Sequence, residues 1–164
     1  MVVVADTSPL NYLVLLDAVE ILHQLYKRLC VPEAVINELL SCDAPLQVQT
    51  WAASLPVWVE VHAVPDEFLT DTRWQSLHPG EQAALALATL LNADLVLMDE
   101  RTGASVARQS GFRVTGTLGV LDEAAQQRLL DLAVVMEKLK ATTFRYPRSL
   151  VAELLAEDAE RRKE

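Results

Sequence analysis

Short apolar runs alternate with stretches of helical periodicity along this chain of 164 residues. "VVVA" (2–5) and "DLVLM" (94–98) lack polar alternation, as expected of strands that are buried on both faces. "VWVEVHAV" (57–64) alternates, as a half-exposed edge strand does. Two shorter runs, "RLCV" (28–31) and "FRV" (112–114), also predict strands. Strands separated by helical stretches are typical of an α/β domain with a parallel sheet.

Helical stretches fill the intervals between these strands. Ser8 and Pro9 provide a cap and a first turn for one or two helices over 10–26. The stretch 79–93, "PGEQAALALATLLNA", is apolar nearly all round, which indicates a buried helix. Further helices are predicted at 32–40, at 44–55 with Trp51 on the apolar side, at 101–111 ending at Gly111, and over 118–163, where Pro147 starts the last one. Because there is no repeat and no low-complexity linker, the pattern predicts one domain, residues 1–164, with a helical C-terminal part from about residue 118.

Composition narrows the class of protein. Hydrophobic residues make up 51% of the chain, which is enough for a sizeable core at this length. No run approaches the roughly 18 uncharged apolar residues of a membrane span. No basic region precedes the N-terminal apolar residues, as it does in a signal peptide. We therefore expect a cytoplasmic protein without a membrane segment.

Cysteine, histidine and charge narrow the class further. Cys30 and Cys42 fit no common zinc pattern and are interpreted as ordinary, partly buried residues. The three histidines, His23, His62 and His78, are scattered, so a histidine-rich metal site is not expected. The net charge of −9 argues against a large non-specific nucleic-acid surface, but not against nucleic acid held at a small site. It also favours a basic partner, or a metal ion that neutralises clustered acids.

Polar side chains follow three of the predicted strands at the point where each strand ends. They are Asp6-Thr7-Ser8, Asp99-Glu100 and Thr115-Gly116-Thr117. In an open parallel sheet, ligands bind in the crevice at the carboxyl ends of the strands. We therefore expect these side chains to meet in one crevice.

Two further acids are expected at the same crevice. Glu38 sits on the shoulder of an apolar helical stripe, and Glu81 lies in the first turn of the buried helix, where the helix dipole favours an acid. With Asp6 and Asp99 they make four carboxylates, which repel one another unless a cation lies between them. Ligands that are all oxygen suit Mg²⁺ or Mn²⁺. Such ions generate a hydroxide nucleophile and hold both oxygens of a phosphodiester displacement.

Each of these residues also has a simpler structural interpretation. Asp6, Thr117 and the pair Asp99-Glu100 are suitable helix caps, and the two helical acids are ordinary in their positions. Their joint position around one crevice is what favours a site. Other types of site fit less well, because the chain has no Walker P-loop, no GxGxxG and no GxSxG motif.

In three segments the chain resembles the PIN-domain nucleases, most of all their VapC-like branch. The segments are an N-terminal "DTSPL" (6–10), a mid-chain "HPGEQAALALA" (78–88), and "LVLMDE" (95–100) followed by "VTGTLGVL" (114–121). The resemblance covers about residues 2–122, and the ordered set is more specific than any single segment.

The resemblance implies a three-layer α/β/α sandwich around a central, mostly parallel sheet. It also implies an Mg²⁺ or Mn²⁺ ion bound by acids at the strand ends. Asp6, Glu38, Glu81 and Asp99 match the four acids of the family and are the expected catalytic and metal-binding residues, with Glu100 as a further metal ligand.

The resemblance extends to substrate and partners. Thr7, Ser8 and Thr117 match hydroxyl positions near the metal or the scissile phosphate. PIN domains cut single-stranded or structured RNA, and many are toxins of bacterial toxin–antitoxin pairs and form dimers. An RNA substrate, an antitoxin protein and a homodimer are therefore what the resemblance implies for this chain.

The chain departs from this branch at one point. The branch commonly has two aspartates after the strand, followed by Gly-Arg, whereas this chain has Asp99-Glu100 followed by Gly103-Ala104. The missing arginine removes one expected phosphate contact. Arg101 and Arg108, on the helix that follows Asp99, are the nearest substitutes.

The sequence thus predicts a metal-dependent endoribonuclease that hydrolyses RNA phosphodiester bonds, as the toxin of a toxin–antitoxin pair. The alternative is a catalytically weak PIN-like protein that acts by binding a basic protein partner or regulator, which the acidity and the missing arginine favour. A phosphate-accepting receiver domain with Asp99 as the acceptor is a weaker hypothesis, because "FRVTGTLG" offers no lysine after the strand. A homodimer is expected also because the apolar residues of 10–26 exceed one helical face.

Overall fold

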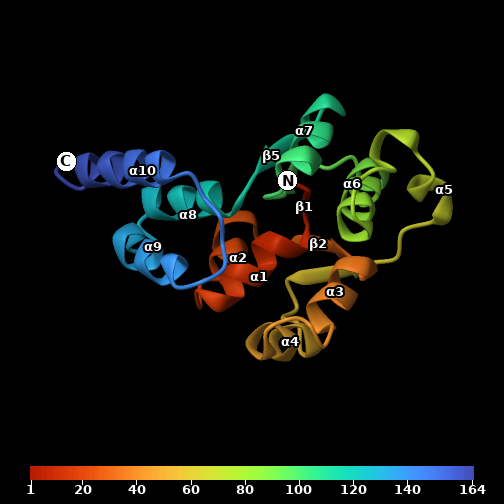
Figure 1. The fold of residues 1–164 in the computed structure, drawn as a ribbon, viewed down its shortest axis with the longest axis horizontal. Helices are drawn as coiled ribbons and strands as arrows, with labels where there is room; N and C mark the ends of the chain where they lie inside the picture. The colour runs from red at the N-terminus through yellow and green to blue at the C-terminus, as the bar shows by residue number, and fades with distance from the viewer.

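The computed structural model describes residues 1–164 and places a five-stranded sheet at the centre of the chain (Figure 1). All four strand pairs are parallel, and the spatial order of the strands is β3-β2-β1-β4-β5. The strands are β1 (Val3–Ala5), β2 (Leu29–Pro32), β3 (Val59–His62), β4 (Leu95–Leu97) and β5 (Arg113–Thr115). The predicted α/β/α sandwich is therefore confirmed, and the alternating run at 57–64 forms an edge strand as predicted.

Helices connect the strands and continue after the last one. They are α1 (Thr7–Leu15), α2 (Ile21–Tyr26), α3 (Glu33–Leu40), α4 (Leu46–Ala53), α5 (Asp66–Leu69), the 3₁₀ helix η1 (Thr72–Trp74), α6 (Pro79–Leu91), α7 (Arg101–Gln109), α8 (Thr117–Gln126), α9 (Leu132–Lys140) and α10 (Arg148–Arg161). The short elements α5 and η1 were not predicted. Because each spans a single turn, neither carries a readable apolar period.

Alternation along the strands divides the core between the two faces of the sheet. In β1, Val3 and Ala5 belong to a large apolar cluster with residues of α1, α2 and α8. Val4 points the other way, into a second cluster that includes Trp74 of η1 and Leu85 of α6. Since successive side chains of a strand point to opposite faces, a fully buried β1 requires helices on both.

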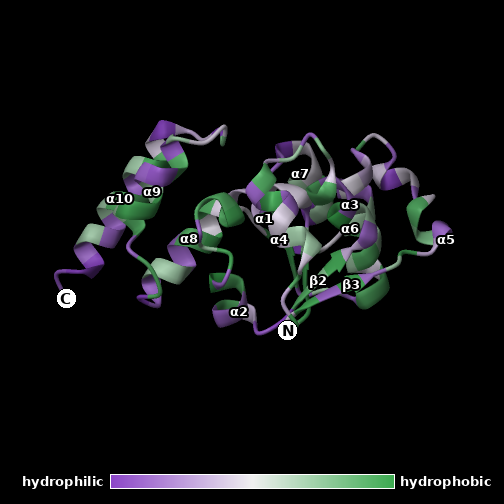
Figure 2. Ribbon diagram, turned by 90° about the horizontal axis from the view of Figure 1, so that it is seen from below, coloured by the Kyte–Doolittle hydropathy of each residue, from purple (hydrophilic) through white to green (hydrophobic).

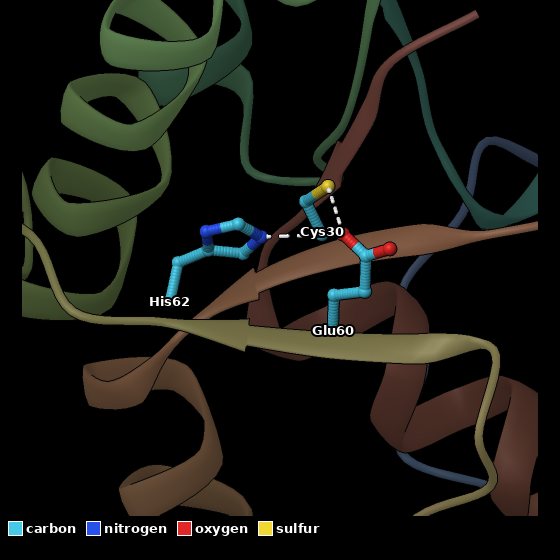
Figure 3. A group of neighbouring side chains, drawn as sticks. All are labelled: Cys30, Glu60 and His62. Carbon is cyan, nitrogen blue, oxygen red and sulfur yellow. Dashed lines mark hydrogen bonds and ion pairs between the residues drawn. The ribbon is translucent and has the colours of Figure 1, made fainter.

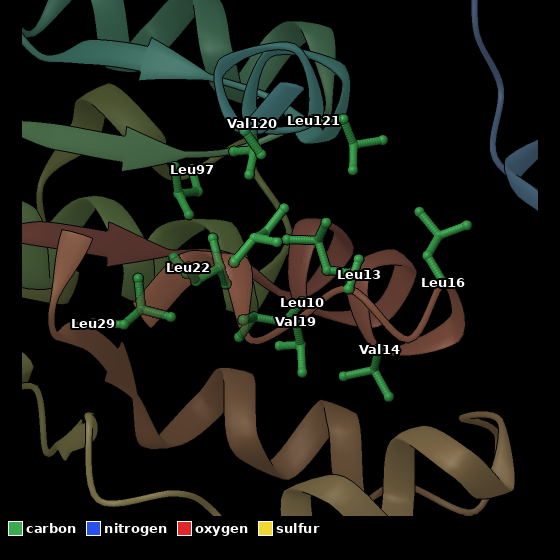
Figure 4. Packing of buried hydrophobic residues seen from close by; sticks show 14 of the residues in the cluster. Leu10, Leu13, Val14, Leu16, Val19, Leu22, Leu29, Leu97, Val120 and Leu121 are labelled. Carbon is green, nitrogen blue, oxygen red and sulfur yellow. The ribbon is translucent and has the colours of Figure 1, made fainter. Parts of the chain in front are cut away.

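The apolar stretch 10–26 forms two helices, α1 and α2, rather than one. Asp17, between them, has a φ of 53°, which interrupts the helix. Leu10, Leu13 and Leu22 are fully buried in the chain's own core (Figure 4). The apolar excess that led us to expect a homodimer is therefore covered within one chain.

The C-terminal helices gather at one end of the molecule. Both ribbon views place α9 and α10 beside α8 and far from α5 (Figures 1 and 2). Val151 of α10 is buried against the larger apolar cluster, which ties the last helix to the sheet side of the molecule. None of the helices combines the length and the apolar character that crossing a bilayer requires.

The register of the central strands brings three chain segments to one edge. Ala5, Leu97 and Thr115 occupy one row of the sheet. Just beyond this row, the Asp6 N–H donates to the Leu97 carbonyl at 2.9 Å, and the Met98 N–H donates to the Thr115 carbonyl at 3.0 Å. The segments that follow β1, β4 and β5 therefore leave the sheet side by side.

We predict that Leu97→Ala lowers the free energy of unfolding by about 2–5 kcal/mol, because Leu97 is fully buried in a central strand and its truncation leaves a cavity. Leu46, which is 77% exposed, provides the control: Leu46→Ala is expected to stay within about 0.5 kcal/mol of wild type. Urea denaturation measures both. Equal losses in the two variants would contradict the placement of β4 at the centre of the sheet.

Candidate functional site

A pocket of about 460 Å³ opens at the carboxyl edge of the sheet. Four acidic side chains line it together with hydroxyl groups, one histidine and one tyrosine. The lining residues are Asp6, Thr7, Ser8, Asn11, Tyr12, Glu38, His78, Pro79, Glu81 and Glu100. Asp99 borders the same group, since its Oδ2 accepts a hydrogen bond from Ser8 Oγ at 3.0 Å. No lysine or arginine lines the pocket, and His78 is the one basic side chain in its wall.

Asp6 is the most deeply buried of these acids, with 4% of its surface exposed. It occupies the N-cap position of α1, but its side chain makes no capping hydrogen bond there. Burial raises the pKa of Asp6 from its usual 3.8 to about 7, the Thr7 N–H opposes this, and the charges of Glu81, Glu38 and Asp99 add to the rise. The helix-cap interpretation of Asp6 therefore does not describe its side chain.

Asp99 is fixed by hydrogen bonds from two neighbouring segments. Its Oδ1 accepts from the Thr117 N–H at 2.6 Å, and its Oδ2 accepts from Thr117 Oγ1 at 2.7 Å. Thr117 is fully buried at the start of α8, and its hydroxyl proton is directed to Asp99. Together with the bond from Ser8, these contacts orient the carboxylate at the junction of β1, β4 and β5.

Glu38 and Glu81 reach the pocket from two neighbouring helices, α3 and α6. Glu38, on α3, accepts a hydrogen bond from Thr7 Oγ1 at 2.5 Å. Glu81, in the first turn of α6, is 6% exposed, and its Oε2 is buried without any hydrogen-bond partner. Burial, followed by the charge of Glu100, raises the pKa of Glu81. An acceptor oxygen left unpaired inside a protein is unusual and indicates a missing partner.

Three glycines make room for these carboxylates. An added Cβ would lie 2.5 Å from Glu38 Oε1 at Gly80, 2.5 Å from Glu81 Oε2 at Gly103, and 2.6 Å from Asp99 Oδ1 at Gly116. Real Cβ atoms do not approach other atoms so closely, and so any side chain at these positions would displace an acid. The sequence contained this signal in its glycine positions, but the partners of the glycines become visible only in the fold.

Glu100 has a structural role as well as a place in the pocket wall. As the N-cap of α7, it accepts a hydrogen bond from the Gly103 N–H at 2.7 Å through its Oε2. This bond is the main reason that the pKa of Glu100 lies below its usual value. The helix-cap interpretation therefore holds for Glu100.

The two arginines expected to hold phosphates lie outside the pocket wall. Arg101 is the first residue of α7 and is exposed beside Glu100. Arg108 is exposed seven residues further along the same helix, a distance of about 10 Å at 1.5 Å per residue. Since α7 runs back toward the start of β5, Arg108 lies toward the opposite edge of the sheet.

The donor set fits a hard divalent cation. Asp6, Glu81 and Asp99 offer carboxylate oxygens from three different elements, and the unpaired Oε2 of Glu81 is a ready ligand atom. Burial is the main cause of the raised pKa of Asp6, and a cation among these acids would relieve the repulsion that adds to it. Oxygen ligands of this kind are those that Mg²⁺ and Mn²⁺ prefer.

We predict that Gly116→Ala reduces the rise in melting temperature produced by Mn²⁺ to less than half of the wild-type rise, because the new Cβ displaces the Asp99 carboxylate. Thermal melts with and without Mn²⁺ measure this. Gly111→Ala is the matched control, since Gly111 has a φ of +93° and no atom within 4 Å of an added Cβ. That control should melt earlier through backbone strain yet keep the full response to Mn²⁺. An undiminished response in Gly116→Ala would contradict the site.

A comparison with known proteins identifies the family to which the chain belongs. Residues 2–160 match a family model described as a PIN domain. A search of curated proteins and a search of solved structures found no match. The family model spans the sheet, all the pocket residues and most of α10. Family membership indicates a nuclease, and such nucleases generally depend on a divalent metal. By its sequence, its fold and its cluster of acids, the chain belongs to the PIN-domain family.

Proposed function

We propose that this PIN-domain protein is an endoribonuclease that hydrolyses RNA phosphodiester bonds with Mg²⁺ or Mn²⁺ as its cofactor. The observation that carries the proposal is the convergence of carboxylates from α3, from α6 and from the ends of β1 and β4 on one pocket whose wall contains no lysine or arginine. A pocket of this charge attracts a metal ion, and an RNA phosphate binds there only when such an ion is present.

We assign a role in metal binding or in orienting water to each acid of the pocket. Asp6, Glu81 and Asp99 are the groups that would hold the ion, and Glu38, exposed at the rim, would hold and orient the attacking water. When bound, the ion would supply positive charge to the scissile phosphate and would lower the pKa of water, so that the water can lose a proton and attack at neutral pH. Glu100 would accept a hydrogen bond from water at the rim through the oxygen that does not cap α7.

The hydroxyl groups have two different roles in this proposal. Thr117 is a positioning residue, because it is fully buried and its hydroxyl is bonded to Asp99. Thr7 and Ser8 are partly exposed in the pocket wall, and each donates its single proton to a carboxylate. Rotation of either hydroxyl toward the pocket would allow it to donate to a phosphate oxygen.

The biological role that we propose is that of a toxin whose activity is blocked by an antitoxin protein. This rests on the resemblance of the segments 6–10, 78–88 and 114–121 to the VapC-like branch. The net charge of −9 suits a basic antitoxin as the partner. The same resemblance supports the proposed homodimer.

A second candidate function is binding without efficient cleavage. The observation that favours it is the absence of lysine and arginine from the pocket wall, which leaves the substrate phosphate with the ion alone as its cationic contact. A PIN-like protein of this kind would bind a basic partner at its acidic surface and cut RNA slowly or not at all.

We predict that Asp99→Asn lowers the rate of Mn²⁺-dependent RNA cleavage by about 100-fold or more, because it removes a metal ligand, while RNA binding is kept. Purified protein and a panel of labelled RNAs measure both. Asp43→Asn is the matched control, since Asp43 is exposed and outside the pocket. Toxicity on expression in a bacterial host should follow the same order, with Asp99→Asn harmless. Equal cleavage by wild type and Asp99→Asn would exclude this nuclease site, and no cleavage by either would favour the binding function.

The raised pKa of Asp6 predicts a pH dependence of stability in the absence of metal. With a folded pKa of about 7 against the usual 3.8, the folded chain holds a proton that the unfolded chain has lost between these two values. The contribution of Asp6 to the free energy of unfolding is therefore fully present below about pH 4 and is lost as the pH rises to 7.

Asparagine at position 6 does not titrate, so the variant Asp6→Asn lacks this pH-dependent loss of stability. We expect the free energy of unfolding of Asp6→Asn, minus that of wild type, to rise by up to about 1.4 kcal/mol per pH unit between pH 4 and 7 and to stay constant above pH 7. Urea denaturation in the presence of a chelator measures it, with Asp43→Asn expected to run parallel to wild type. Parallel curves for wild type and Asp6→Asn would show that Asp6 is not a buried, repelled carboxylate.

A further inference from the structure

A second group of metal-ligand side chains lies on the sheet, away from the carboxylate pocket. Cys30 belongs to β2, and Glu60 and His62 belong to the edge strand β3. The parallel register pairs Cys30 with Glu60 and Pro32 with His62. Because side chains two residues apart share a face of a strand, the three side chains point to the same side of the sheet. Figure 3 shows them directed toward one another.

The potential ligand atoms are close together. Glu60 Oε2 lies 3.7 Å from Cys30 Sγ and 3.5 Å from His62 Nε2. One ligand atom from each residue lies within 4.8 Å of the other two. His62 Nε2 is buried and has no hydrogen-bond partner. The other carboxylate oxygen of Glu60 accepts a hydrogen bond from Arg28 Nη1 at 3.3 Å in an exposed ion pair.

Two of the three separations match those around a tetrahedral zinc ion, and the ligand atoms of Cys30 and His62 lie within 4.8 Å of each other. With Zn–S near 2.3 Å and Zn–N or Zn–O near 2.1 Å, neighbouring ligand atoms of a tetrahedron lie about 3.4–3.6 Å apart. Both measured separations lie within about 0.1 Å of this range. A thiolate and an imidazole also select zinc over the hard ions that suit the carboxylate pocket.

We propose that Cys30, Glu60 and His62 form a binding site for Zn²⁺ or a similar soft divalent transition-metal ion, separate from the carboxylate pocket. On binding, the Cys30 thiol releases its proton to solvent and binds as the thiolate. His62 binds as the neutral imidazole through Nε2, and Glu60 binds through Oε2. No electron is transferred, and one position of the tetrahedron is left for water or for a fourth ligand.

The free Cys30 thiol donates its proton to Glu60 Oε2 over a long contact of 3.7 Å. An ion would replace that proton and would also give the buried His62 Nε2 a partner.

The proposed site would connect the edge strand β3 to its neighbour β2. The strand β3 pairs with β2 alone, so one of its sides has no neighbouring strand. An ion bound by residues of both strands cross-links them, and its binding free energy adds to the stability of the fold. The helix that carries Glu38 follows β2 directly, so the cross-link would lie close to the pocket without sharing a residue with it.

The test uses the full chain freed of metal with a chelator and titrated with Co²⁺ as a spectroscopic probe for zinc. We expect one equivalent of Co²⁺ to produce a thiolate-to-cobalt charge-transfer band in the near ultraviolet, and Zn²⁺ to displace it. The band should be lost in Cys30→Ser. It should be kept in Cys42→Ser, the matched control, because Cys42 is exposed and outside the group.

A folding defect in Cys30→Ser would also remove the band, because Cys30 is buried. Substitutions at two partly exposed positions provide an independent test. His62→Gln and Glu60→Gln should each weaken Zn²⁺ binding about 10-fold or more, measured by competition with a chromophoric chelator. Zn²⁺ should raise the melting temperature of wild type but not of His62→Gln.

The outcomes separate this site from the proposed nuclease site. Asp99→Asn should keep the cobalt band and the affinity for Zn²⁺, whatever its effect on RNA cleavage. Absence of the band in wild type, its loss in Cys42→Ser, or unchanged Zn²⁺ affinity in His62→Gln would each overturn the proposal.

Discussion

Electrostatic repulsion among carboxylates is the constraint on which the rest of this structure depends. Asp6 and Glu81 are buried in one pocket with Glu38, Asp99 and Glu100 nearby, and no lysine or arginine lines the wall. Burial and mutual repulsion together raise the pKa of Asp6 to about 7. A chain that holds acids in this way gives up stability at neutral pH unless a cation joins them.

The fold supplies what this arrangement requires. A parallel sheet brings the ends of β1, β4 and β5 to one edge, and apolar helices on both faces hold the short strands in register. Hydrogen bonds from Thr117 and Ser8 then orient Asp99, and glycines at 103 and 116 leave space for the acids. The pocket is thus built by backbone geometry as much as by the acids themselves.

The sequence was sufficient to predict the sheet and the position of the acids. Continuous apolar runs such as 94–98 indicate strands buried on both faces, and the residue after such a strand lies at the carboxyl edge. Side-chain geometry was not predictable in this way. That Glu100 caps α7 and that Thr117 is wholly buried follow from tertiary packing. The group of Cys30, Glu60 and His62 depends on the register between β2 and β3, which no local pattern specifies.

The most direct test of the account is the position of Mn²⁺ in crystals of the wild-type protein soaked in millimolar Mn²⁺, located by its anomalous scattering. We expect a peak within about 2–2.5 Å of carboxylate oxygens of Asp6, Glu81 and Asp99, since oxygen ligands lie at such distances from hard divalent ions. A well-diffracting soaked crystal with no peak among these carboxylates would contradict the claim that the pocket exists to hold a metal ion.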